Sequence, residues 1–155
     1  MQRSVRIDER IVGGYAQVAP ILRLEFDEVI RAPLDEMRVD FRGGFIGRRV
    51  DAQLGGLWAD DQAVTVPVRW EASRHPRWFP RMDGRLELTG AGRGSIDVAL
   101  VGSYTIPFGI LGALLDRLRG RRAANRSLRR YVHEVAAGLE AQLVKHAPPL
   151  PERSP

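Results

Sequence analysis

Cysteine is absent from this chain of 155 residues, and lysine occurs only once, at Lys145. Without cysteine the chain can form no disulfide framework and offers no thiolate nucleophile or thiolate metal ligand. No apolar run approaches the ~18 residues of a transmembrane helix. Residues 1–6 also lack the apolar segment of a signal peptide. We therefore expect a cytoplasmic protein without a membrane span.

The charge balance is basic, with 24 basic and 19 acidic residues, a net charge of +5 and a pI of about 10.6. Basic proteins attract polyanions, but here acidic residues are interspersed along the whole chain, as on ordinary mixed-sign surfaces. An arginine preference this strong is typical of a GC-rich genome. We therefore expect no nucleic-acid partner.

Apolar and polar residues alternate in several segments, which is the pattern of strands with one covered and one solvated face. The alternation is found at residues 5–11, 38–42, 49–54, 64–72, 85–89 and 95–104. Glycine-rich turns separate these segments and leave no room for crossover helices, so residues from about 37 to 105 should form an antiparallel meander. Pro67 lies inside a strand, so its nitrogen should face an edge or a bulge.

After Pro107 the spacing of apolar residues changes to steps of three and four, which predicts one amphipathic helix from about 109 to 145. Gly120 could loosen it locally. Pro148 and Pro149 should end it, so we expect a single domain over 1–147 and a disordered tail over 148–155. Residues from about 15 to 34 contain a shorter stretch with helical spacing.

One apolar helix stripe and one apolar sheet face must bury each other. The fold class is therefore α+β, with a curved antiparallel β-sheet wrapped around a long C-terminal α-helix. Where the sheet and the helix do not meet, an apolar pocket would remain.

The order of elements and several local sequences resemble the START-like or SRPBCC superfamily, which includes polyketide cyclases and lipid-transfer domains. The matching segments are 70–72, 79–80, 102–109 and 111–112, the last leading into Asp116. Ile106 stands where bacterial members often have a second proline. The resemblance implies a helix-grip fold with a hydrophobic ligand cavity. It does not imply a reaction, because many members only bind.

Eleven side chains are candidates for the ligand site. Most lie on the predicted inner faces, and Trp78 and Phe79 lie in a long hairpin loop where they could cap a pocket mouth or simply close the end of the sheet. The three polar candidates, Arg48, Tyr104 and Asn125, could orient a ligand. An arginine can also lie along apolar surface with its head in water. The set is Arg48, Trp70, Trp78, Phe79, Leu100, Tyr104, Phe108, Leu115, Asn125, Tyr131 and Val132.

The sequence gives little support for a metal site, a cofactor site or a catalytic site. His75, His133 and His146 show no metal-ligand spacing, so we expect no metal and no cofactor. The glycines at 90, 92 and 94 lie between two strands and indicate a hairpin turn, not a dinucleotide loop. We assign no catalytic residue.

The interpretation is therefore a non-enzymatic binder of a small hydrophobic or amphipathic ligand, lipid- or polyketide-like, held between sheet and C-terminal helix. One alternative is a cyclase, dehydratase or isomerase acting on a polyketide-like substrate, for which Tyr104 and His75 are the available acid–base groups. Another is an interaction protein that binds a polyanion through the seven arginines of segment 117–130. The chain could also form a homodimer.

Overall fold

The computed structural model describes residues 2–39, 48–72, 81–105 and 116–147, with side chains over 4–37, 51–71, 81–105 and 125–147. These residues form one strand, four short helical segments, six further strands and a long helix. In chain order these are β1 (Gln2–Val12), the 3-10 turn η1 (Tyr15–Gln17), α1 (Val18–Leu24), the π-helical turn η2 (Asp27–Arg31), α2 (Ala32–Asp35), β2 (Arg38–Val39), β3 (Arg48–Leu54), β4 (Trp58–Ala59), β5 (Ala63–Ala72), β6 (Arg81–Gly92), β7 (Ser95–Thr105) and α3 (Asp116–Lys145).

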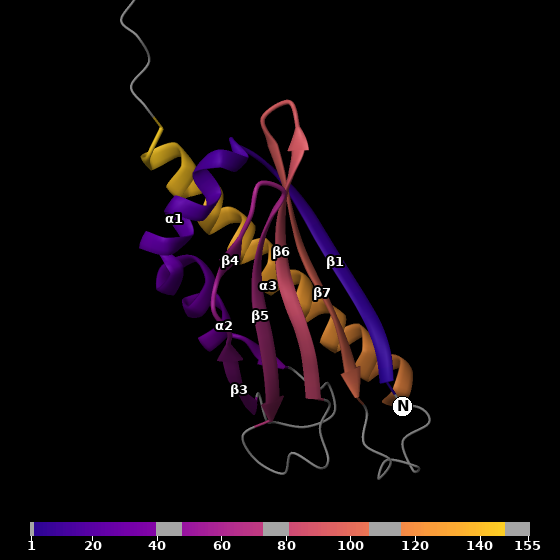
Figure 1. Cartoon of the computed structure of the whole chain (residues 1–155). Helices are drawn as coiled ribbons and strands as arrows, with labels where there is room; N and C mark the ends of the chain where they lie inside the picture. The colour runs from indigo at the N-terminus through magenta and orange to yellow at the C-terminus, as the bar shows by residue number, and fades with distance from the viewer. Residues whose placement is uncertain (1, 40–47, 73–80, 106–115, 148–155) are drawn as a thin grey trace, which may run out of the picture.

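All strand pairs are antiparallel, and the sheet order is β1-β7-β6-β5-β3-β2, with the short β4 pairing with β5. The predicted meander is confirmed. The first strand returns to pair with the last, so that Val5 lies opposite Gly102. The sheet is curved and does not close, and the helices lie against its concave side (Figure 1). The chain therefore has the expected α+β architecture.

Pro67 shows how the sheet accommodates a residue without an N–H. On one side of β5, the pairing with β3 ends at Val68 and the pairing with β4 begins at Thr65, so Pro67 lies in the gap between them. Its carbonyl still accepts a hydrogen bond of 2.8 Å from the N–H of Gly55. The missing donor faces a gap in the ladder, which agrees with the expected edge or bulge position.

The helix α3 runs without interruption through Gly120 and ends at Lys145, close to the predicted end. Its predicted first residues, 109–115, lie outside the described residues. The stretch from 15 to 34 is helical as expected, although a π-helical turn interrupts it. α3 contacts β1 and β7 on one side and α1, η2 and α2 on another. No helix within the described ranges is long and apolar enough to cross a membrane.

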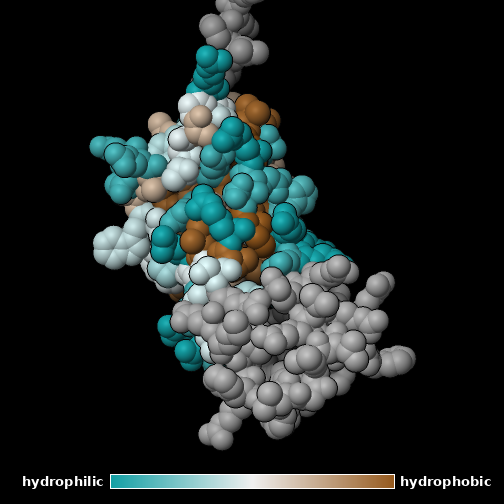
Figure 2. Space-filling view, turned by 90° about the vertical axis from the view of Figure 1, so that its right-hand side faces the viewer, coloured by the Kyte–Doolittle hydropathy of each residue, from teal (hydrophilic) through white to brown (hydrophobic). Residues whose placement is uncertain are grey.

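The core lies between the concave face and the helical layer. It takes alternate residues from the strands and residues three or four apart from α3, among them Leu128, Val132, Val135 and Leu139. Asn125 is exposed, one turn before Leu128, which is the first buried residue among the described side chains of α3. The burial expected from its spacing is therefore wrong. From the side of β1 and α3, some apolar residues reach the surface between hydrophilic ones (Figure 2).

The strand β6 is longer than predicted. The segment 73–84 was expected to be a turn, but β6 already begins at Arg81. Gly84 hides this extension because it leaves a gap in the apolar alternation. At the other end of β6 the glycine-rich segment is the expected hairpin, in which Gly92, Arg93 and Gly94 all have positive φ angles.

Candidate functional site

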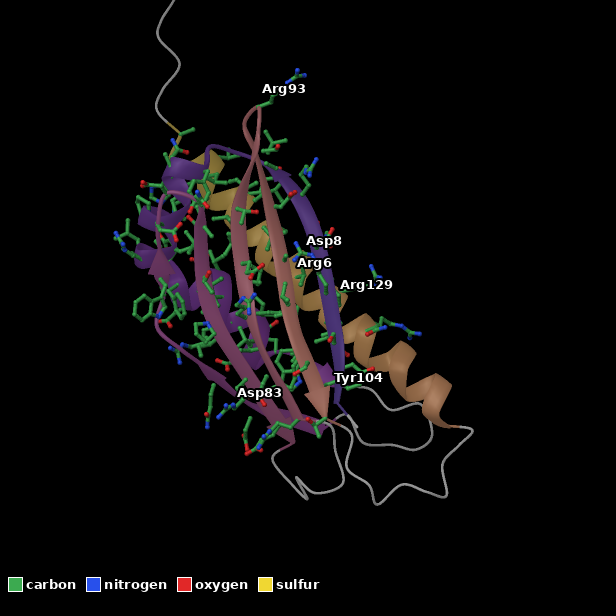
Figure 3. All side chains as sticks on the ribbon, turned by 45° about the vertical axis from the view of Figure 1, so that its right-hand side comes forward. Arg6, Asp8, Asp83, Arg93, Tyr104 and Arg129 are labelled. Carbon is green, nitrogen blue, oxygen red and sulfur yellow. The ribbon has the colours of Figure 1, made fainter. Side chains whose placement is uncertain are left out.

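The strands β1 and β6 begin, and β5 and β7 end, at one end of the sheet, which we call the lower end of the concave face (Figure 1). A row of apolar residues crosses the strands there. Ala52 on β3 pairs with Trp70, Trp70 with Met82, and Met82 with Tyr104. Trp70 and Met82 are buried, whereas Tyr104 is only half-buried near the end of β7 (Figure 3). Because Tyr104 also carries a hydroxyl, this row combines an apolar wall with one polar group.

The next row places two glycines opposite each other on the same face. Gly84 of β6 pairs with Gly102 of β7, between Val68 and Val5. A Cβ atom at Gly84 would lie 2.8 Å from the carbonyl oxygen of Val101, and one at Gly102 would lie 2.6 Å from that of Asp83. The two strands approach so closely that neither position can carry a side chain. The concave face therefore has a patch of backbone beside Tyr104 that carries no side chains of its own, which we call the bare patch.

Above this patch the concave face is filled by branched side chains from three strands and by α3. Val66, Leu86 and Leu100 share one row and are fully buried. From the helix, Tyr131 places its hydroxyl 3.4 Å from the carbonyl oxygen of Ile30, and burial raises the pKa of this tyrosine. This upper part is packed core.

The predicted site residues thus fall into groups. Trp70, Leu100 and Tyr104 lie on the concave face, and Tyr131 and Val132 are buried on the side of α3 that joins the core. The parity of Arg48 on β3 matches that of Ala52, but its side chain is not among the described ones, and Asn125 is exposed. The predicted Trp78, Phe79, Phe108 and Leu115 lie outside the described residues, as does His75.

Sequence reasoning missed Met82 and the pairing of Gly84 with Gly102. A signal existed, because residues 82, 84, 86 and 88 continue the alternation if a glycine is allowed in it. The opposition of the two glycines depends on the strand register, which the sequence does not state.

The convex face carries charges that neutralise one another. A shallow hollow of about 400 Å³ on β1 and β7 is lined by Arg6, Asp8, Glu9, Arg10 and Asp97. Arg10 makes a two-pronged bond to Asp97, at 2.6 and 3.0 Å, and this hydrogen bond lowers the pKa of Asp97. Arg6, labelled with Asp8 in Figure 3, lies 3.8 Å from Glu87. With its arginines paired, the hollow has no clear preference for an anion.

The histidines and arginines outside the sheet are surface groups where their side chains are described. His133 on α3 lies 2.9 Å from a carboxylate oxygen of Glu9 on β1, and His146 lies 3.7 Å from one of Glu25. Within the described residues, no cluster of histidines and carboxylates could hold a metal ion. Arg129 is exposed and Arg130 bonds Glu134 at 2.8 Å. The side chains at 117–122 are not described.

No family model and no curated protein matches the chain. Solved structures match over nearly its whole length. A conserved protein from Geobacillus kaustophilus has a TM-score of 0.55 at 12% identity, covering 92% of this chain and 97% of that one. A hypothetical protein from Helicobacter pylori has a TM-score of 0.53 at 9% identity, covering 87% and 86%.

A third match is the Zhui aromatase/cyclase of a Streptomyces species, with a TM-score of 0.51 at 12% identity, covering 96% of this chain and 98% of that one. At such identities the likeness concerns the fold alone. The antiparallel sheet order, the curvature and the C-terminal helix agree with a helix-grip fold.

Proposed function

We propose that this protein binds a small apolar or amphipathic molecule at the lower end of the concave face. The observation that carries the proposal is the bare patch formed by Gly84 and Gly102, next to the half-buried Tyr104. A ligand could bury its apolar part against this patch and Trp70, while the Tyr104 hydroxyl sets its orientation, as in ligand pockets generally.

The other predicted residues keep their place in this proposal. Leu100, Tyr131 and Val132 would support the apolar wall from behind. Trp78, Phe79, Phe108 and Leu115 would contribute contacts from the segments that follow β5 and β7, and Arg48 and Asn125 would be further polar contacts. The fold supports this function, since structures of this kind include the aromatase/cyclase named above.

The first test is native mass spectrometry of the purified protein before and after extraction with organic solvent. We expect a co-purifying apolar molecule that disappears on extraction, and we expect the extracted protein to take up dodecanoate. A bare chain mass together with no uptake of dodecanoate would contradict the proposal. Product formation from a bound polyketide-like molecule would instead assign the cyclase-type function.

A matched pair of variants locates the site. Tyr104→Phe removes the hydroxyl of the site and should weaken dodecanoate binding ~3- to 10-fold, the value of one hydrogen bond. Tyr15→Phe makes the same chemical change elsewhere, where the hydroxyl bonds the carbonyl of Asp60 at 2.9 Å. It should leave the affinity unchanged. Equal effects of both variants would place the ligand away from Tyr104.

A further inference from the structure

Met82 fills the space that the two glycines leave on the concave face. A Cβ atom built at Gly84 would lie 3.2 Å from the Met82 Cε atom, and one built at Gly102 would lie 3.1 Å from it. Met82 precedes Gly84 by two residues on β6 and faces the same side, opposite Tyr104. Its side chain is 1% exposed. The methyl group of Met82 therefore covers the bare patch.

The two glycines cannot be replaced by residues that fill this space themselves. At both positions a Cβ atom would meet backbone atoms of the neighbouring strand at 2.6 to 2.8 Å. The covering group must therefore come from a neighbour. Because it is not attached at the patch, that group can leave without any change in the backbone of β6 or β7.

The type of residue also suits displacement. The next concave row contains Val66, Leu86 and Leu100, which are all branched and fully buried. Methionine is unbranched and has three rotatable bonds, so it can exchange between conformations that fill different spaces. The flexible side chain lies at the boundary between this fixed row and the half-buried Tyr104.

We propose that Met82 is a displaceable plug that sets which ligands the site accepts. This inference rests on the proposed function. A slender apolar group, such as the end of an unbranched alkyl chain, replaces the Met82 methyl on the Gly84–Gly102 patch, and the polar end of the ligand stays near Tyr104. Methylene groups replace a methyl group of similar size, so the patch keeps its packing contacts in both states.

The test uses protein whose methionine methyl groups are labelled with carbon-13, observed by NMR during a titration with dodecanoate. The chain has three methionines, at positions 1, 37 and 82. We expect the Met82 methyl resonance, assigned with the Met82→Leu variant, to shift progressively to saturation at the dissociation constant measured independently by calorimetry. Met37, which is 8% exposed after α2, reports any general change of the core.

The outcomes separate the two proposals. If dodecanoate binds and the Met82 resonance does not move, the plug is wrong and the proposed function stands. If dodecanoate does not bind, the plug is contradicted, and if the purified protein also has a bare chain mass, the proposed function is contradicted with it.

Two reciprocal substitutions between methionine and leucine test whether Met82 determines the affinity for dodecanoate. Met82→Leu replaces the flexible plug by a branched side chain, and should weaken dodecanoate binding ~5-fold or more because the branched group moves aside less readily. Leu86→Met makes the reverse change two positions after Gly84 at an equally buried residue of β6. It should change the affinity less than ~2-fold, since no glycine patch lies beneath it. Equal effects in both variants would overturn the proposal.

Discussion

At the scale of single residues, Gln142 is out of keeping with its surroundings. It lies on α3 next to the buried Leu143, and only 5% of its surface is exposed. Its Oε1 atom has no hydrogen-bond donor among the described residues. A buried acceptor that loses water without gaining a partner costs about 1–3 kcal/mol. This side chain should therefore lower the stability of the fold.

Replacing Gln142 by methionine should raise the free energy of unfolding by ~1 kcal/mol, because the unpaired acceptor is removed while the volume and the helix propensity stay similar. Urea unfolding at neutral pH measures this change. Gln142→Glu is the matched control, since it places a charge at the same buried position and should lower the stability. A Gln142→Met protein that is less stable than the wild type would show that Oε1 has a partner.

At the scale of elements, the gap in the ladder beside Pro67 depends on its neighbour Gly55. A Cβ atom at Gly55 would lie 2.8 Å from both Cβ and Cγ of Pro67, whose ring cannot rotate away. At Gly56 a Cβ atom would meet nothing within 4 Å. The two adjacent glycines therefore form a natural pair for comparison.

Gly55→Ala should lower the free energy of unfolding by ~1–3 kcal/mol, the usual cost of overpacking. Gly56→Ala should be neutral or slightly stabilising, since alanine restricts the unfolded chain more than glycine does. Chemical denaturation of both variants measures these changes in the free energy of unfolding. If the two alanines had the same effect, the close packing of Gly55 on Pro67 would not contribute to the sheet.

The sequence was sufficient to predict most elements and insufficient for details that depend on pairing. Alternation located β1, β3, β5 and β7, and the change of period located α3. The strand β4 is only two residues long, too short to show any period. In the site, Trp70, Leu100 and Tyr104 were predicted from their parity. Met82 was missed because its role depends on Gly84 lying opposite Gly102, which only the register of β6 and β7 creates.

At the scale of the whole molecule, Tyr131 joins the helical layer to the core. It is 1% exposed on α3, and its hydroxyl reaches Ile30 in η2. Burial disfavours the phenolate and raises the pKa of Tyr131 above its ordinary value. In the unfolded chain this tyrosine is solvated and titrates at about pH 10. The difference between the two states makes global unfolding depend on alkaline pH.

The sign follows from the protons bound. Above about pH 10 the unfolded chain has lost the Tyr131 proton while the folded chain retains it, so the unfolded state binds fewer protons and the free energy of unfolding falls as pH rises. One such group contributes ~1.4 kcal/mol per pH unit. Stability below that range is unaffected by this titration. Burial also raises the pKa of Tyr15, with Asp60 and Asp61 adding to the effect, so the wild-type slope contains more than one tyrosine.

Urea unfolding of the wild type and of Tyr131→Phe at several values between about pH 8 and pH 11 isolates the contribution of Tyr131. The variant should lose little stability at pH 8, because the bond to Ile30 is long at 3.4 Å. Above about pH 10 its stability should decline less steeply than that of the wild type. Tyr15→Phe, which changes a more exposed tyrosine, should reduce the slope less. Parallel curves for the wild type and Tyr131→Phe would show that the phenolate is tolerated in the folded chain, and that Tyr131 does not link the packing of α3 on the core to pH.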